Sequence, residues 1–359
     1  MTIQEEIPLA PLTTLGVGGR ARYFAELKRE DEVREAVQFA KSRELPLFIL
    51  GGGSNLVVAD SGWPGLVLWM AMGGITTPAT EDAGNAVLFS VGAGVDWDDF
   101  VAQAIVQNCA GVECLSGIPG SVGGTPVQNV GAYGQEVSDT IESVRVFDLK
   151  DERVVVLPKP ACGFRYRSSI FNTAEHGRYI ILRVNYRLKR GGSPSLKYAD
   201  LQKYFAERVA TNSAERKLPS LTEVRDAVRE IRRRKGMLIV PGDEDCRSAG
   251  SFFKNPILTE AAFEELRARA TTKGMAIPNY PALDAQHKVS AAWLVENSGF
   301  SKGYEMGSAG ISQKHALALI NRGEAKASDI ISLKDRIQNG VQEAWGVRLE
   351  PEPVFVGFA

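Results

Sequence analysis

The chain has 359 residues, of which 44% are hydrophobic and 24% charged, and its formal net charge is −1 at pH 7. This length predicts two or three domains with ample apolar material for their cores. The near-zero charge excludes the electrostatic signature of a nucleic-acid or anionic-membrane binder, and no apolar run approaches the roughly 18 residues of a membrane span. Residues 1–6 lack a basic region followed by an apolar one, so we expect a cytoplasmic protein.

The four cysteines are scattered without C-x-x-C spacing, and the three histidines are dispersed along the chain. The sequence therefore predicts neither a disulfide framework nor a metal site.

Periodicity predicts the secondary structure in outline. Apolar residues at helical spacing predict helices over 31–41, 97–108, 221–235, 259–273, 289–297, 312–322 and 329–345. Runs of β-branched and aromatic residues predict strands over 45–50, 56–60, 65–69, 87–94, 144–148, 154–157, 179–188 and 347–356. Asp96, Ser220 and Ser328 are expected N-caps, with Gly346 just beyond the last helix.

Three glycine-rich clusters differ in what they predict. Residues 15–21 match G-x-G-x-x-A by letters alone, with no strand before them, so we reject them as a dinucleotide fingerprint. Residues 51–55 lie between predicted strands and exceed a tight turn, which stays the alternative. Residues 117–134 hold six glycines, and Pro119 and Pro126 limit their flexibility. Their apolar neighbours argue against the alternative of a surface linker, so we expect backbone amides in both segments to hold an anionic ligand.

Residues 163–171 contain two arginines among aromatic and hydroxyl side chains. A strand with a period of two would place Arg165 and Arg167 on one face and Tyr166 and Ser168 on the other. An arginine between such neighbours needs a partner.

Residues 250–256 combine a hydroxyl, an ammonium and an amide with two phenylalanines. No G-x-S-x-G elbow surrounds Ser251 and histidine is scarce, which disfavours acyl transfer but leaves Ser251 able to donate a proton. Glu350 and Glu352 lie on one side of an extended segment, for which a charged terminal strand is the alternative. The basic run 232–235 complements a helix C-terminus and is partly a solvated face.

Taken together and in order, the motifs of this chain resemble those of the UDP-N-acetylenolpyruvoylglucosamine reductases, the MurB family, over essentially its whole length. The matching stretches are Thr14-Leu-Gly-Val-Gly-Gly, Leu50-Gly-Gly-Gly-Ser-Asn-Leu, Gly117-Ile-Pro-Gly-Ser-Val-Gly, Gln128-Asn-Val-Gly-Ala-Tyr-Gly, Tyr166-Arg-Ser-Ser-Ile-Phe, Ala249-Gly-Ser-Phe-Phe-Lys-Asn-Pro, Ala292-Trp-Leu-Val-Glu and Leu349-Glu-Pro-Glu. Residues 195–201 are similar to an insertion of the family's longer type, which folds a tyrosine loop over the substrate.

This resemblance implies an α+β fold: a two-subdomain FAD-binding module of the PCMH/vanillyl-alcohol-oxidase type and a C-terminal α+β substrate-binding domain. The implied boundaries are 1–75 for the first FAD-binding subdomain, with about 347–359 returning near the active site, 76–218 for the second, and 219–346 for the substrate-binding domain. The implied cofactors are noncovalent FAD and NADPH as reductant. The implied substrate is UDP-N-acetylglucosamine enolpyruvate, reduced to UDP-N-acetylmuramate for peptidoglycan synthesis, and hence for cell shape and division. We expect a monomer that neither binds nucleic acid nor inserts into a membrane.

The resemblance also assigns roles to single residues. By this likeness, hydride added to the enolpyruvyl group produces an enolate-like intermediate, which Arg167 stabilises with Glu352 beside it and the Ser251 hydroxyl protonates. The implied cofactor-binding residues are Gly51, Gly52, Gly53, Ser54, Asn55, Gly117, Pro119, Gly120, Ser121, Gly123, Asn129, Gly131, Ala132 and Tyr133. The implied substrate-binding residues are Tyr198, Lys235, Asn255 and His315.

Two of these assignments stay open. His315 stands where some relatives have glutamine, and a structural histidine on a helix is the alternative to a ligand contact. The segment 236–248 is longer than is usual in the family, which leaves the role of Lys235 open.

Two other functions compete with this interpretation. One is an oxidase of hydroxylated substrates on the same FAD-binding architecture, although no histidine for covalent flavin attachment occurs between Met1 and Glu175. The other is a nucleotide-sugar binding protein without catalysis, against which Arg167, Ser251 and Glu352 speak. Purified protein without flavin absorbance would favour the second.

Overall fold

A computed structural model of the chain describes residues 1–78, 84–212, 218–281 and 286–358. They fall into two compact units, each described by itself. The first comprises Met1–Ile7, Ala21–Gly52 and Pro64–Arg233, and the second comprises Pro8–Arg20, Gly53–Trp63 and Arg234–Ala359. The three domain boundaries expected from the resemblance stay a prediction.

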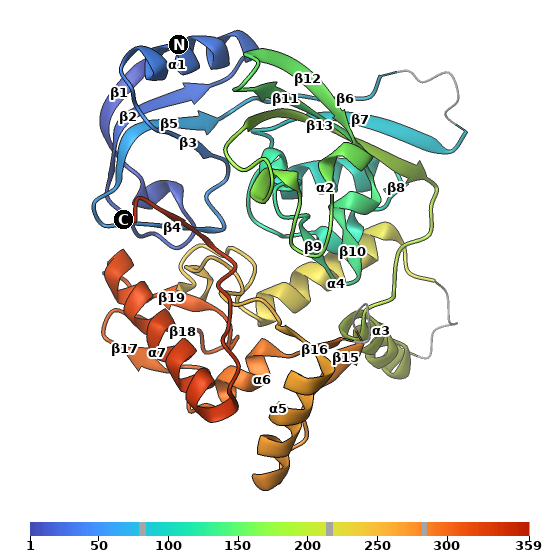
Figure 1. Ribbon diagram of the computed structural model, residues 1–359. Helices are drawn as coiled ribbons and strands as arrows, with labels where there is room; N and C mark the ends of the chain where they lie inside the picture. Colours follow the sequence, from blue (N-terminus) through green and yellow to red (C-terminus); the bar gives the residue numbers. More distant parts are fainter. Residues whose placement is uncertain (79–83, 213–217, 282–285, 359) are drawn as a thin grey trace. The chain divides into compact units, whose positions relative to one another are not determined.

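The helices and strands among the described residues are labelled in Figure 1. The α-helices are α1 Glu30–Ser42, α2 Trp97–Val106, α3 Ala199–Asn212, α4 Leu221–Arg234, α5 Glu260–Thr272, α6 Ala291–Glu296 and α7 Ala327–Trp345. The strands are β1 Ile3–Pro8, β2 Arg20–Leu27, β3 Leu47–Leu50, β4 Leu56–Val58, β5 Trp63–Met70, β6 Ile75–Thr76, β7 Ala86–Gly92, β8 Cys109–Ala110, β9 Gly131–Ala132, β10 Gln135–Glu136, β11 Ile141–Asp148, β12 Arg153–Pro158, β13 Tyr179–Arg190, β14 Ile257–Leu258, β15 Asn279–Pro281, β16 His287–Val289, β17 Glu305–Met306, β18 Ala309–Ile311, β19 Leu319–Asn321 and β20 Val354–Val356.

The first unit contains a small sheet in the order β1-β2-β5-β3, in which β3 runs parallel to β5. The amphipathic helix α1 buries Val33 and Val37 in the same core as Leu66 and Leu68 of β5. Burying each such side chain contributes about 1.5–3 kcal/mol.

The second sheet of this unit has the order β12-β11-β13-β7-β6, and its long strand β13 is antiparallel to both neighbours. Helix α2 packs against it in one core, where Phe100 lies 4.9 Å from the ring of Tyr186. Asp96 accepts hydrogen bonds from the backbone N–H groups of Asp98 and Asp99, so the predicted N-cap is confirmed. This cap fixes where α2 begins, directly before the glycine-rich segment.

Helices α3 and α4 form a further core of the first unit with Tyr133. The predicted N-cap Ser220 of α4 is confirmed, and it forms a capping box: Glu223 N donates to Ser220 Oγ while Glu223 Oε2 accepts from Ser220 N.

The second unit combines the sheets β14-β16-β15, β17-β18-β19 and β20-β4 with α5, α6 and α7. Its core includes Phe252, Leu294, Leu333 and Trp345, all buried. Strand β20, from the chain's C-terminal end, runs parallel to β4, from its first sixty residues. This pairing joins the C-terminal end of the chain to an N-terminal segment within the second unit.

Helix α7 begins differently from expectation. Ala327 is its first residue and Lys326 precedes it, so the predicted N-cap at Ser328 is wrong. The carboxylate of Asp60 accepts the N–H groups of Ala327 and Ser328, at 2.7 and 3.1 Å. At the other end Gly346 adopts a φ of 72°, and this predicted C-terminal position is confirmed.

Residues 163–171 do not form the expected strand. A tight turn joins Arg165 to Ser168, and a 3-10 turn over Ile170–Asn172 follows. The hydroxyl of Ser169 accepts a backbone N–H within that turn. Such side-chain bonds offer the backbone an alternative to a strand ladder.

Residues 312–322 do not form the expected helix either. Strand β19 pairs with β18, and the turn between them carries His315. The apolar run 316–320 is continuous and buried, which is the pattern of an interior strand. The last strand, β20, is shorter than expected because Pro351 and Pro353 interrupt the predicted segment.

All four cysteines are buried and free. Among the helices that the structure describes, none has the length and apolar character needed to cross a membrane.

Candidate active site

A pocket of about 230 Å³ lies in the first unit, where both glycine-rich segments reach it. It is lined by Gly51, Gly52, Trp69, Met70, Ala71, Gly94, Asp96, Gly120 and Ser121. Desolvation raises the pKa of Asp96 above its usual value. The hydrogen bonds from the two backbone N–H groups that it caps lower this pKa, but by less.

The glycines are required here because backbone segments approach closely. A Cβ on Gly52 would lie 2.5 Å from Gly120 Cα, and one on Gly51 would lie 2.8 Å from Ser121 Oγ. Ser121 Oγ is buried and has no hydrogen-bond partner among the described residues. A buried hydroxyl without a partner costs about 1–3 kcal/mol, so it marks a place where a ligand is expected to donate or accept.

The glycine-rich segment 117–134 is built into the first unit rather than being a linker. Val122 is fully buried, and its N–H donates to Val95 O at 2.9 Å. The N–H of Gly123 donates to Ala93 O at 2.8 Å, so several amides expected to be uncovered are already bonded within the protein. Of the segment 117–134, only Gly120 and Ser121 therefore line the pocket.

Helix α4 holds the start of this segment. Asp98 accepts the Gly117 N–H at 2.6 Å and forms an ion pair with Arg225 through both carboxylate oxygens. It also contacts Arg229. Arg232 is buried, donates to Gly117 O at 2.9 Å, and has a pKa lowered by that burial. Arg232 is therefore not one of the solvated members of the basic run 232–235.

Arg167 lies at the tip of the turn that replaces the expected strand, with a φ of 52°. Its Nη1 donates to Gly131 O at 3.0 Å, which connects it to the end of the glycine-rich segment. A non-glycine residue in the left-handed region is strained, and such strain is found preferentially at functional sites.

Asn129 also has a positive φ, and its side chain is engaged within the protein. It donates to Glu136 Oε2 at 2.7 Å and to Arg165 O at 3.1 Å, and it accepts the N–H of Ser138 at 3.1 Å. These bonds fasten the segment to the arginine turn. Its predicted contact with a cofactor stays a prediction.

Tyr198 precedes α3 and packs edge-on against Tyr133, with ring centroids 5.4 Å apart. The segment before it is fixed by the buried carboxylate of Glu113, which accepts the Ser195 N–H at 2.9 Å. Tyr198 is itself 43% exposed.

Gly53, Ser54 and Asn55 belong to the second unit. Gly53 O accepts the N–H of Thr14 at 3.1 Å, and Asn55 Nδ2 donates to Glu352 O at 3.3 Å. Of the predicted cluster 51–55, Gly51 and Gly52 therefore line the pocket, Gly53 is bonded to Thr14, and Asn55 is connected to the segment that carries Glu352.

Three distant segments of the second unit meet around Ser251. The N–H of Phe252 donates to Leu317 O at 2.8 Å, and the N–H of Glu352 donates to Phe252 O at 2.9 Å. Ser251 Oγ lies 3.5 Å from His315 Nε2. Of Arg167, Ser251 and Glu352, which sequence spacing alone cannot join, the second unit brings the segments of Ser251 and Glu352 together, and His315 with them.

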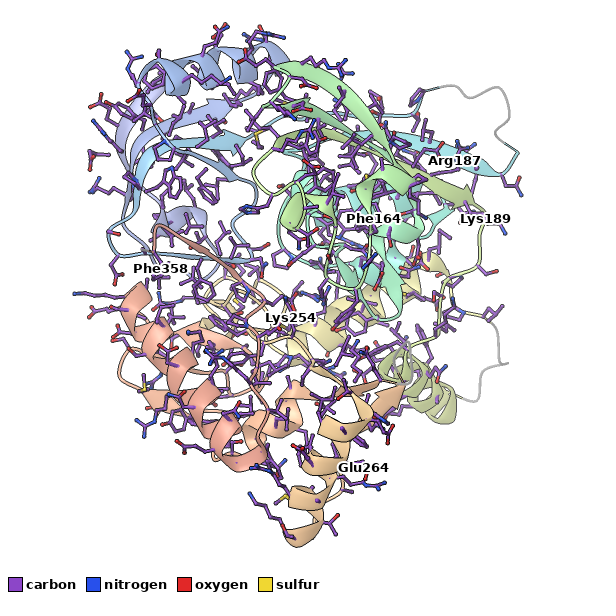
Figure 2. All side chains as sticks on the ribbon, in the orientation of Figure 1. Phe164, Arg187, Lys189, Lys254, Glu264 and Phe358 are labelled. Carbon is purple, nitrogen blue, oxygen red and sulfur yellow. The ribbon has the colours of Figure 1, made fainter. Side chains whose placement is uncertain are left out.

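The neighbours of Ser251 have mixed roles. Lys254, labelled in Figure 2, lies 3.5 Å from Glu350 Oε2. Asn255 Oδ1 accepts the N–H of Ala291 at the start of α6, at 2.9 Å. Lys235 follows α4 at the beginning of the last segment of the second unit.

The structure thus forms two groups of predicted residues. The pocket, Arg167 and Tyr198 lie in the first unit; Ser251, Glu352, Asn255 and His315 lie in the second. That the two groups act on one substrate stays a prediction.

Sequence reasoning missed part of the pocket lining. Trp69, Met70 and Ala71 come from the end of β5 and the residue after it, which resemble an ordinary buried strand. Asp96 was expected only as a cap. Gly94 stood at the end of a predicted strand, which was its only signal in the sequence. In the structure it packs so closely on Ala71 that no side chain fits.

The chain matches the protein family described as "UDP-N-acetylenolpyruvoylglucosamine reductase, C-terminal domain" over residues 241–356, and the one described as "FAD binding domain" over residues 21–157. It is similar to the UDP-N-acetylenolpyruvoylglucosamine reductase of Thermobifida fusca, with 44% identity over 98% of this chain and 97% of that relative. The corresponding reductase of Streptomyces coelicolor is 45% identical over 99% of this chain and 90% of its own.

A crystal structure of UDP-N-acetylenolpyruvylglucosamine reductase from Thermus caldophilus is also similar. The match covers 99% of this chain and 100% of that one, with a TM-score of 0.65 and 27% identity. The expected fold class, an α+β FAD-binding module followed by a C-terminal α+β domain, is confirmed.

The residues of the first unit fit FAD. The family match over 21–157 includes both pocket-lining glycine segments. Gly52 approaches the backbone of Gly120 so closely that no side chain fits between the two segments, and the buried hydroxyl of Ser121 lacks a protein partner among the described residues. Gly51, Gly52, Gly120 and Ser121 are the residues that would hold the cofactor.

Proposed function

The chain belongs to the UDP-N-acetylenolpyruvoylglucosamine reductase family, and from that premise we propose that it reduces UDP-N-acetylglucosamine enolpyruvate to UDP-N-acetylmuramate in peptidoglycan precursor synthesis. The structural observation that supports this reaction best is the meeting of three distant segments at Ser251, which places a hydroxyl beside the segment of Glu352. The proposed reaction needs such a proton donor.

FAD is the proposed noncovalent cofactor and NADPH the proposed reductant. When bound, FAD supplies a hydride taken from NADPH to the terminal carbon of the enolpyruvyl ether. Gly51, Gly52 and Ser121 would contact the cofactor through backbone and hydroxyl groups, and the bonds of Gly117 to Asp98 and Arg232 would keep that segment rigid.

Arg167 is proposed to stabilise the negative charge that develops on the substrate, and Glu352 is proposed as a further catalytic residue. The guanidinium presents a planar fork that matches a carboxylate, and its bond to Gly131 O fixes its orientation. A charge that is already in position need not be reoriented when the reaction occurs. Such electrostatic preorganisation makes the largest contribution to the rate enhancement of many enzymes.

Ser251 is proposed to complete the reaction by giving its hydroxyl proton to the substrate carbon. An enolate-like carbon is a strong base, so even a weakly acidic hydroxyl can protonate it. Tyr198, Lys235, Asn255 and His315 are proposed to contact the substrate. The exposed side chain of Tyr198 supports its part of this assignment. We further propose a cytoplasmic monomer.

The two half-reactions, followed by FAD absorbance after rapid mixing, test this proposal. Ser251→Ala should leave reduction of the flavin by NADPH nearly intact and slow reoxidation by the enolpyruvyl substrate about 100-fold or more. Ser298→Ala, which removes a hydroxyl bonded to Leu294 O within the same unit, is the control and should change neither rate. Equal slowing of both half-reactions by Ser251→Ala would reject the proton-donor role.

A further inference from the structure

We propose that His315 is a positioning residue for Ser251: its Nε2–H donates a hydrogen bond to Ser251 Oγ, directs the hydroxyl proton toward the substrate, and stabilises the oxygen once that proton has left. The inference rests on the proposed function of Ser251 and extends it to a residue that acts through the serine.

The turn that carries His315 is rigid. Ser312 is completely buried, and its Oγ accepts the N–H groups of Lys314 and His315, at 3.0 and 3.3 Å. The N–H of Ala318 closes the turn on His315 O at 3.1 Å, and the N–H of Ser312 donates to Ala318 O at 2.9 Å. The imidazole therefore projects from a fixed backbone.

The segment 236–248 braces this turn from outside. Asp245 Oδ1 accepts the N–H of Gln313 at 2.9 Å, and Lys314 Nζ forms an ion pair with Asp243. Gln313 and Lys314, which directly precede His315, are thus both bonded to the segment 236–248, which is longer than is usual in the family. Its structural role is to hold the histidine turn.

The hydrogen-bond network assigns the tautomer of His315. The backbone N–H of Leu317 donates to Nδ1 at 3.2 Å, so Nδ1 is an acceptor and the neutral ring carries its proton on Nε2. Nε2 lies 3.5 Å from Ser251 Oγ. This is the long end of a hydrogen bond, as is common for catalytic contacts without ligand, which tighten when substrate binds.

This polarity is the reverse of that in a serine nucleophile, whose histidine accepts the hydroxyl proton. Here Ser251 Oγ accepts from the histidine, and its own hydrogen is left for the substrate. In the proton transfer the Ser251 O–H bond breaks, a C–H bond forms on the enolate carbon, and the electron pair stays on the oxygen. The Nε2–H of His315 then donates to the Ser251 alkoxide until a proton from water restores the hydroxyl. A hydrogen bond to a charged acceptor is about twice as strong as one to a neutral acceptor, so this bond stabilises the alkoxide.

A matched pair of substitutions at His315 separates the effect of the donated hydrogen bond from the effect of side-chain size. Gln has an amide N–H that can replace Nε2–H, whereas Met has a similar length and no donor. We expect His315→Met to slow flavin reoxidation by the enolpyruvyl substrate about 10- to 100-fold, with NADPH reduction unchanged, and His315→Gln to stay within roughly threefold of the wild type. His287→Gln is the control, because His287 packs on Phe263 and bonds Glu260 elsewhere in the unit.

The double variant Ser251→Ala/His315→Met tests whether the histidine acts through the serine. If it does, the double variant at saturating substrate, where a lost binding contact of His315 no longer limits the rate, reoxidises no more slowly than Ser251→Ala alone; multiplied losses at saturation would overturn the inference. Equal rates for His315→Met and His315→Gln would do the same. If Ser251→Ala itself leaves reoxidation unchanged, the proposed function of Ser251 fails, which is a separate outcome.

A spectroscopic readout on the unaltered holoenzyme does not depend on any variant folding. Nitrogen NMR of protein labelled in histidine, with His315 assigned by comparison with His315→Gln, should show a protonated Nε2 and an unprotonated Nδ1. A proton on Nδ1 would overturn the inference.

Discussion

Gly52→Ala perturbs the pocket at the place where the chain leaves least room. The new methyl carbon would lie 2.5 Å from Gly120 Cα and 2.7 Å from Ser121 N, although ordinary contacts begin near 3.4 Å. Both neighbours are backbone atoms that no rotamer change can move, so one segment must shift by about 1 Å. Overpacking of this kind costs about 1–3 kcal/mol. Since the shift falls on the lining of the pocket, the dissociation constant for FAD should rise roughly 5- to 150-fold.

Titration of FAD into the apoprotein, followed by protein fluorescence, measures this affinity. Thermal unfolding without FAD shows whether the folded chain has been damaged as well. Gly73→Ala is the matched control, because a Cβ built there meets no atom within 4 Å. Wild-type affinity for FAD in Gly52→Ala would refute the argument that the close approach of Gly52 and Gly120 shapes the cofactor site.

Three further predictions follow from single contacts. Ser121→Ala should weaken FAD binding about tenfold without lowering the apoprotein's melting temperature, because no protein bond of that buried hydroxyl is lost; a lower melting temperature with normal affinity would contradict this. Arg167→Lys should reduce kcat by about tenfold or more at unchanged FAD affinity, since an ammonium cannot reproduce the guanidinium fork; wild-type kcat in steady-state assays would refute it. Burial pushes the pKa of Asp98 up, but the bonds from Arg225 and Gly117 outweigh it and leave that pKa below its usual value. The carboxylate therefore stabilises the fold above its unfolded pKa near 4 and loses this effect as pH falls through the lower folded value, so melting temperatures of the wild type should drop between about pH 5 and 3 more steeply than those of Asp98→Asn.

Local signals predicted much of the fold. The spacing of Val33 and Val37 predicted α1, and the Asp96 and Ser220 caps predicted the starts of α2 and α4, because these signals act within one or two turns of chain. The two glycine-rich segments were found for the same reason. The close approach of backbone to backbone leaves a trace in the sequence when only glycine fits.

Contacts from distant parts of the chain were the source of the errors. The carboxylate of Asp60 caps α7 across more than 260 residues, so the local serine was a poor guide. At 312–322 the turn is set by the buried Ser312, and at 163–171 by the hydroxyl of Ser169, where side-chain bonds override periodicity. The pairing of Phe252 with Leu317 and Glu352 left no pattern in the sequence.

Reoxidation of the NADPH-reduced holoenzyme under anaerobic conditions tests the central claim most directly. Rapid mixing with UDP-N-acetylglucosamine enolpyruvate should restore the absorbance of oxidised FAD at a rate at least equal to kcat, with one UDP-N-acetylmuramate formed per flavin. A reduced enzyme that binds this substrate but stays reduced until oxygen is admitted would contradict the account.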